Sequence, residues 1–353
     1  MTRLDRFVAA LRELEVDGAY VSNLVNVRYL CGFTGSNGAL FVPVDGEVRL
    51  LTDGRYLDQA RSETDGVQIV ITRELHRSAG DDMTPGRWAV ETHDLSVDDH
   101  ELVRAATDAQ VELIQLPKVV EGMRVVKDDG EIDALRRACQ ISVEALEGLL
   151  TGPLEGRTER EVARDLEWRM LELGAEAIAF ETILASGPNS AIPHHSPTDR
   201  VLQRGDLVKA DFGARVDGYH ADCTRTVVLG QADDWQREVH AAVQASQAAG
   251  VEALREGTPV PSVDEVARGV LDDAGWLENF TTGLGHGVGL EIHEDPFISH
   301  RHAGRLARCT TLTMEPGIYV PERGGVRIED TVLVTSDDPE VLTPMTTDLL
   351  EIA

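Results

Sequence analysis

The first third of the chain alternates short apolar runs with amphipathic stretches. One apolar face predicts a surface helix over residues 3–14, because its members recur at helical spacing: Leu4, Phe7, Val8 and Leu11. Two more helices are predicted over 56–62 and 97–107. Strands are predicted at 18–21, 39–42, 48–52, 67–71, 88–91 and 111–115. This mixture predicts a small layered α/β domain.

A long helical pattern begins near Asp128, and Pro117 lies shortly before it. We therefore expect an N-terminal domain over residues 1–122 and a second domain over residues 123–353. The second domain contains a weak repeat, because Glu161-Val-Ala-Arg and Glu265-Val-Ala-Arg each start a helix that follows a longer one and precedes β-rich sequence. This order predicts an α+β domain of two similar halves with a cleft between them.

Composition narrows the classes of function. The 33 Lys and Arg residues against 62 Asp and Glu residues give a net charge of -29, which should repel nucleic acid and anionic membranes. No apolar run is long enough to span a membrane, and the charged N-terminal helix does not resemble a signal peptide. We therefore expect a cytoplasmic protein. The four cysteines are widely scattered and indicate neither a disulfide framework nor a thiolate metal site.

The first candidate chemistry is a pair of aspartates. Asp211 ends a predicted strand, and Asp222 lies eleven positions later, across a turn at Val216-Asp217-Gly218. If the strands pair around that turn, the two carboxylates approach each other. Close carboxylates repel unless a cation neutralises them. Taken alone, this pair is better explained as structural aspartates at strand ends.

The second candidate is a histidine among glycines. His286 is surrounded by Gly283, Gly285, Gly287 and Gly289, and His293 lies seven residues further on. Glycine permits the close backbone approach that a crowded site requires. The glycine spacing and the absence of a following lysine do not match a phosphate-binding loop.

Two glutamates complete the candidate set. Glu315 and Glu329 both lie in apolar, strand-like sequence, where a buried glutamate needs a partner. Arg327 could satisfy one of them. Two glutamates together with two aspartates and a histidine favour a metal pair. One nitrogen and four carboxylates suit Mn²⁺, Co²⁺ or Zn²⁺ rather than copper or an iron–sulfur cluster.

These segments together resemble the signature of the aminopeptidase P, prolidase and methionine aminopeptidase superfamily, whose catalytic domain has the pita-bread fold. The stretch Asn26-Val-Arg-Tyr-Leu-Cys-Gly-Phe-Thr-Gly-Ser also resembles the creatinase-type N-terminal domain. Methionine aminopeptidases lack that domain, so the resemblance narrows to the Xaa-Pro peptidase branch. It implies two divalent metal ions, Mn²⁺ first, with five ligands: Asp211, Asp222, His286, Glu315 and Glu329.

The resemblance also implies further roles. Glu315 would accept the proton of the attacking water, His293 would contact the substrate carbonyl, and Arg327 would support the ligands from behind. His194 would be the second active-site histidine, with the adjacent His195 as the alternative. The N-terminal domain would mediate a homodimer, and a candidate loop that reaches a neighbour is Asp53-Gly-Arg55-Tyr56, although a connection between a strand and a helix explains Arg55 alone better.

The expected function is hydrolysis of the Xaa-Pro bond at the N-terminus of proline-containing peptides by an aminopeptidase. The alternative is an Xaa-Pro dipeptidase, which must also bind the free carboxylate of proline. Arg301 is the closest candidate for that contact, beside Arg305 and Arg308, but a solvated surface loop explains each of these arginines better, which favours the aminopeptidase. A binding module of the same fold and a metal-free, creatinase-like hydrolase are less favoured, because every ligand type is retained.

Overall fold

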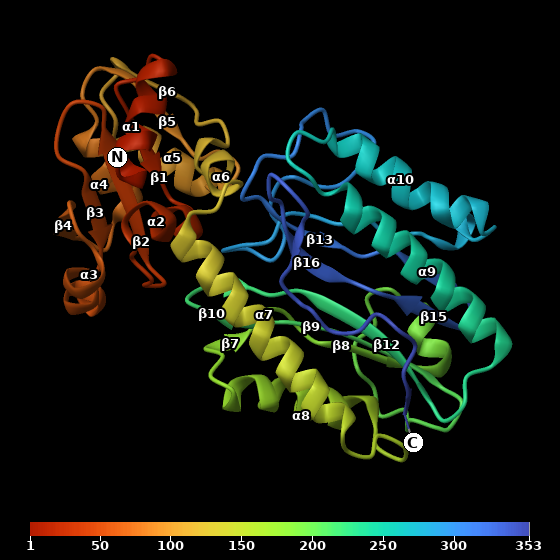
Figure 1. Cartoon of the computed structure of the whole chain (residues 1–353). Coiled ribbons are helices and arrows are strands. Elements are labelled where there is room, and N and C mark those ends of the chain that lie inside the picture. The colour runs from red at the N-terminus through yellow and green to blue at the C-terminus, as the bar shows by residue number, and fades with distance from the viewer. Residues whose placement is uncertain (353) are drawn as a thin grey trace. The chain divides into compact units, whose positions relative to one another are not determined.

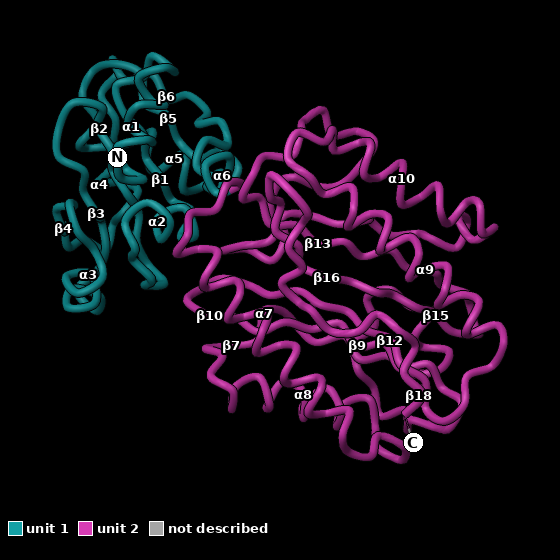
Figure 2. Tube along the Cα trace, in the orientation of Figure 1, with its two compact units in different colours: residues 1–124 teal, residues 125–353 magenta. Residues whose placement is uncertain are grey.

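The computed structural model describes residues 1–352, and the chain divides into two compact units, Met1–Arg124 and Val125–Ala353 (Figure 2). The boundary expected after residue 122 falls inside the last helix of unit 1. Within the described residues, no helix is both long enough and apolar enough to cross a membrane.

Unit 1 is built on a six-stranded mixed sheet. In spatial order its strands are β4 (Gln68–Ile71), β3 (Arg49–Thr52), β2 (Gly38–Pro43), β1 (Gly18–Val21), β5 (Gly86–Val90) and β6 (Val111–Gln115). Strand β2 runs antiparallel to both of its neighbours, and the remaining pairs are parallel. The core includes Phe41 and Trp88, whose rings stack at 4.7 Å. All six strands were predicted, with small differences at their ends.

The helices of unit 1 are α1 (Arg3–Glu13), α2 (Leu24–Cys31), α3 (Leu57–Glu63), α4 (Leu75–Asp82), α5 (Val97–Ala106) and α6 (Val119–Arg124), with a 3-10 turn η1 (Gly54–Tyr56). Helix α1 buries Phe7 and Leu11, as its apolar face predicted. Helices α2, α4 and α6 were not predicted. Helix α2 has ordinary end signals, because the Asn23 side chain caps its first turn and Gly32 ends it with φ 85°.

Unit 2 has two halves, each of which opens with two helices, as the repeat predicted (Figure 1). The first half begins with α7 (Asp129–Leu150) and α8 (Glu159–Glu172), and the second with α9 (Asp234–Ala253) and α10 (Val260–Asp273). Each helix pair packs over its own apolar core. Unit 1 is therefore α/β and unit 2 is α+β in two halves, which is the predicted fold class.

Strands follow each helix pair. Those of the first half are β7 (Ala177–Ile178), β8 (Ile183–Ser186), β9 (Leu207–Phe212), β10 (Ala214–Val216), β11 (Tyr219–His220) and β12 (Cys223–Leu229), with η2 (Gly187–Ala191) after β8. Those of the second half are β13 (Thr311–Met314), β14 (Gly317–Val320), β15 (Gly324–Arg327), β16 (Asp330–Leu333), β17 (Glu340–Val341) and β18 (Glu351–Ile352), preceded by η3 (Leu277–Asn279). The larger sheets have the orders β18-β12-β9-β8 and β13-β16-β17. Strands of both halves thus line the middle of the unit.

Candidate metal centre

Two aspartates come together where β9 and β12 pair. Asp211 lies near the end of β9, and Asp222 directly precedes β12. The antiparallel register places Thr224 opposite Asp211, so Asp222 lies only two residues from the partner of Asp211. The intervening chain turns at Asp217 and Gly218, which have φ values of 48° and 78°. The local sequence therefore folds as the turn residues predicted.

His286 lies in a glycine-rich loop where other backbone segments approach closely. A Cβ on Gly285 would lie 2.1 Å from the carbonyl oxygen of Thr313, and one on Gly287 would lie 2.3 Å from that of Asp295. Only glycine fits at these two positions. The His286 Nδ1 lies 3.0 Å from the Gly287 carbonyl oxygen, which can only accept a hydrogen bond. Nδ1 therefore carries the proton, and Nε2 keeps its lone pair.

The Nε2 atom of His286 faces two carboxylates. It lies 3.3 Å from Glu315 Oε1 and 3.6 Å from Asp222 Oδ2. Burial lowers the pKa of His286 to about 4, so the ring is neutral at neutral pH. A lone pair that points at carboxylate oxygens is unfavourable unless a cation lies between them. A neutral imidazole nitrogen that points, together with carboxylate oxygens, at one shared position is the arrangement expected for the ligands of a metal ion.

Two glutamates reach the same place from the second half. Glu315 directly follows β13, and its Oε1 accepts a hydrogen bond of 3.2 Å from Thr313 Oγ1. Glu329 lies between β15 and β16, and its Oε2 accepts one of 2.6 Å from Thr224 Oγ1. Asp222, His286 and Glu329 place donor atoms within 4.8 Å of one another. The two halves of unit 2 thus both contribute to one cluster.

Arg327 lies behind this cluster and is 1 % exposed. Its guanidinium pairs with Asp211 and donates to Tyr319 Oη at 2.7 Å and to Thr224 Oγ1 at 3.1 Å. The sequence allowed Arg327 to satisfy one of the glutamates, but its ion pair is with Asp211 instead. The four carboxylates of the cluster are thus accompanied by one buried guanidinium, which is paired with Asp211.

The cluster has the properties of a divalent metal site. Asp211 Oδ1 and Glu329 Oε1 are buried and accept no hydrogen bond within the described residues. Burial and the neighbouring carboxylates raise the pKa of Asp222 and of Glu329, and burial raises that of Glu315 to about 7. Divalent cations would supply the missing partners and remove the repulsion. One nitrogen and four carboxylate donors fit a hard or borderline metal.

The five donors lie in the wall of a cavity of about 680 Å³, a size that suits a small ligand. His194, His195 and His293 also line it, with the apolar side chains Phe180, Ile183, Ile292 and Phe297. The His293 ring lies at 4.4 Å from the His286 ring, at 71° to it. Burial and then the charge of His194 lower the pKa of His293. The wall thus combines basic and apolar groups beside the donor cluster.

Comparisons with known proteins agree with this geometry. Residues 133–336 match the sequence profile of metallopeptidase family M24. The chain belongs to this family. Residues 3–126 match the creatinase/prolidase N-terminal domain. The M24 assignment confirms the predicted family and the metallopeptidase class, and M24 metallopeptidases work with a dinuclear centre of divalent metal ions.

Relatives of this M24 chain resemble it over their full length. An Xaa-Pro dipeptidase of Pyrococcus furiosus is 35% identical to it, over 99% of both proteins. The solved structure of an Xaa-Pro dipeptidase from Bacillus anthracis has a TM-score of 0.94, 33% identity and 99% coverage of both chains. That of an X-Pro aminopeptidase from Thermotoga maritima has a TM-score of 0.91, 34% identity and 100% coverage of both. These likenesses confirm the predicted pita-bread fold.

Three arginines of unit 2 that the sequence singled out do not line the M24 cavity. Arg301, Arg305 and Arg308 are all exposed, and none of them lines the cavity. In unit 1, Arg55 forms an ion pair with Asp53 at 2.8 Å, within the 53–56 segment.

Other residues of this M24 site were not predicted. Thr224, Thr313 and Tyr319 hold the donors and Arg327 in place through hydrogen bonds. Glu159, a buried carboxylate at the start of α8, contacts His195. Threonines in strands are common, and a glutamate in the first turn of a helix is an ordinary capping feature, so the local sequence carried no signal for either role.

Proposed function

We propose that this chain is an Xaa-Pro dipeptidase, which hydrolyses the bond between the first residue and a proline that carries the free carboxyl group. The observation that supports this reading is the full-length likeness to proteins named Xaa-Pro dipeptidase, at 35% identity and at a TM-score of 0.94. The sequence favoured an aminopeptidase, because a solvated surface loop was the better explanation for Arg301. The comparisons favour the dipeptidase alternative.

In this proposal two divalent metal ions, with Mn²⁺ first and Co²⁺ or Zn²⁺ as alternatives, are held by five residues: Asp211, Asp222, His286, Glu315 and Glu329. When bound, such a pair activates a water molecule and polarises the scissile carbonyl. The unpartnered oxygens of Asp211 and Glu329 and the lone pair of His286 support the assignment. Arg327 fixes the orientation of Asp211 through their ion pair.

The remaining steps belong to side chains of this chain. Glu315 accepts the proton of the attacking water on a carboxylate oxygen and passes it to the leaving imide nitrogen. His293 and His194 donate hydrogen bonds to the substrate carbonyl as negative charge develops on its oxygen. The apolar wall that includes Phe180 and Phe297 receives the proline ring, which has no amide hydrogen to donate.

An Xaa-Pro aminopeptidase is the second candidate, and one observation favours it. Recognition of a free proline carboxylate needs a cationic group, for which arginine is well suited. No arginine or lysine is among the described residues that line the cavity, whose basic side chains are histidines. Longer peptides, in which the proline carboxyl forms the next peptide bond, need no such group. The X-Pro aminopeptidase of Thermotoga maritima is comparably similar to this chain.

The test compares an Xaa-Pro dipeptide with the matching Xaa-Pro amide and tripeptide, in Mn²⁺, Co²⁺ or Zn²⁺. The dipeptidase proposal expects hydrolysis of the dipeptide and at least tenfold lower kcat/KM for the other two substrates. Equal or faster cleavage of the tripeptide would show an aminopeptidase. Asp222→Asn should abolish all of these activities, whereas Arg301→Ala should leave the KM for the dipeptide unchanged, because Arg301 is exposed and outside the lining.

A further inference from the structure

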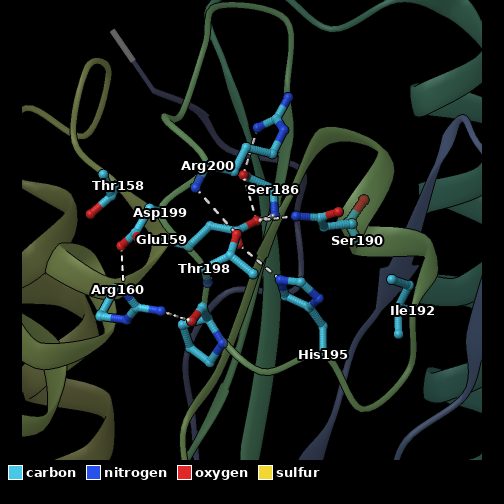
Figure 3. Close-up of polar contacts among 12 residues, drawn as sticks. Thr158, Glu159, Arg160, Ser186, Ser190, Ile192, His195, Thr198, Asp199 and Arg200 are labelled. Carbon is cyan, nitrogen blue, oxygen red and sulfur yellow. Dashed lines mark hydrogen bonds and ion pairs between the residues drawn. The ribbon is translucent and has the colours of Figure 1, made fainter.

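Glu159 is the first residue of α8, and its side chain has no exposed surface. Its carboxylate accepts six hydrogen bonds (Figure 3). Oε1 accepts from Ser186 N and Ser186 Oγ, both at 2.8 Å, and from Asn189 Nδ2 at 3.0 Å. Oε2 accepts from His195 Nε2 at 2.8 Å, Thr198 N at 3.0 Å and Thr198 Oγ1 at 2.6 Å.

All six donors belong to one segment, residues 186–198, which runs from the end of β8 through η2 to the cavity wall. Ser186 and Asn189 lie at its start and Thr198 at its end, so a single carboxylate ties the two ends together. The middle of the segment has a second anchor. Lys209 Nζ donates to the carbonyl oxygens of Ser190 at 3.1 Å and Ile192 at 2.8 Å.

The two neighbouring histidines of this segment have different surroundings. His195 is 8% exposed, and its Nε2 is committed to Glu159. His194 is exposed, lines the cavity, and forms no hydrogen bond through its ring within the described residues. His293 lines the same cavity, so both histidines border the space beside the candidate ligands. The ring that is free to meet a substrate is therefore that of His194.

The network requires an ionised carboxylate. Although burial alone would raise the pKa of Glu159, hydrogen bonds from Thr198, His195, Asn189 and Ser186 lower it to about 2. An amide at this position has only one acceptor oxygen. In Glu159→Gln, three of the donors would therefore face an NH₂ group, on whichever side the amide oxygen points.

We propose that Glu159 is a positioning residue that, through His195 and Thr198, holds the 186–198 segment so that His194 faces the metal centre. The inference rests on the proposed function for the role of His194. Glu159 touches neither the candidate metal ligands nor the cavity, since it is absent from the cavity wall. Its effect on turnover would come from the placement of His194, and displacement of a catalytic group by about 1 Å can cost on the order of 10²-fold in rate.

The experiment uses the metal-loaded full chain and two readouts. Glu159→Gln should increase hydrogen exchange of the amides in the 186–198 segment and lower kcat roughly 10²-fold, with metal content unchanged. Glu159→Asp, which restores two acceptor oxygens, should recover part of both. The matched control is Asp264→Asn, because Asp264 is a carboxylate that is 2% exposed, pairs with Arg268 at 2.8 Å and does not line the cavity. It should change neither readout.

A double-mutant cycle separates positioning from general stabilisation. In a His194→Ala background, Glu159→Gln should lower kcat by less than threefold, because the residue that it positions is already gone. A full additional loss, or unchanged exchange in the 186–198 segment, would overturn the proposal. If Glu159→Gln does not fold, Thr198→Val replaces it in the same double-mutant cycle. This variant removes the 2.6 Å hydrogen bond from Thr198 Oγ1 to Glu159 Oε2. If the wild type cleaves no Xaa-Pro substrate, the proposed function fails, while the exchange measurement still tests the role of Glu159.

Discussion

Removal of the divalent metal should lower the melting temperature of unit 2 as well as stop turnover. Four carboxylates converge on the cluster beside one guanidinium, and Asp211 and Glu329 each keep a buried oxygen without a donor. A metal bound there interacts with the folded unit and has no preformed site in the unfolded chain. Its binding therefore adds directly to the free energy of unfolding.

The size of the effect follows from linkage. Free metal at 100 times its Kd stabilises the folded state by about 2.7 kcal/mol. In a domain of 150–250 residues, each kcal/mol shifts the melting temperature by about 2–4 °C. The expected fall on metal removal is therefore roughly 5–11 °C. Unit 1 contains none of the five candidate ligands, so its transition should not move.

Differential scanning calorimetry with and without EDTA, followed by addition of Mn²⁺, measures this shift. Elemental analysis of the same samples verifies that the metal has been removed and restored. Asp222→Asn should lose the metal-dependent shift, and Asp264→Asn, whose carboxylate lies outside the cavity, should retain it. An unchanged melting temperature after verified loss of metal would refute the reasoning.

Three further predictions concern the same molecule. Glu315→Gln should lower kcat by roughly 10²–10⁴-fold, because the proton acceptor is lost; steady-state assay on an Xaa-Pro dipeptide checks this, and near-normal turnover would contradict it. His293→Ala should lower kcat and retain the metal, whereas His286→Ala should lose metal, and elemental analysis would measure both contents. The opposite pattern would mean that the roles of the two histidines are reversed. We also propose a homodimer, which sedimentation velocity would detect, and a fully active monomer would exclude it.

The spacing of apolar residues along the sequence was sufficient to predict most of the helices and strands. Strands β1 and β6 occupy the predicted residues, and the apolar face of α1 is buried as expected. Helix α4 was missed because it is only eight residues long, contains Gly80, which is a poor helix former, and has Leu75 as its single large apolar side chain. Short helices of this kind depend on packing against the sheet rather than on their own sequence.

The candidate ligands were predictable for a different reason. Local context singled out His286 between glycines and Glu315 after an apolar strand, whereas Asp211 and Asp222 became candidates only together with these residues and through the family resemblance. The residues that hold these groups lack such a context. Glu159 lies 27 residues from Ser186 and 39 from Thr198, and its neighbours in sequence form an ordinary helix start. Only the folded chain brings its six donors together, so no local pattern could have identified it.

The division of unit 2 into halves explains how the cluster can bind metal without depending on it to fold. Asp211 and Asp222 come from the first half, and His286, Glu315 and Glu329 from the second, so a metal held by these candidate ligands would link the halves. Side chains of the two halves also contact each other directly, without a metal. Arg225 on β12 contacts Asp330 on β16 at 2.7 Å, and Thr224 donates to Glu329 at 2.6 Å. Because these contacts need no metal, the metal-free unit should keep its fold while it loses stability, which is why the expected result of chelation is a shifted transition and not an absent one.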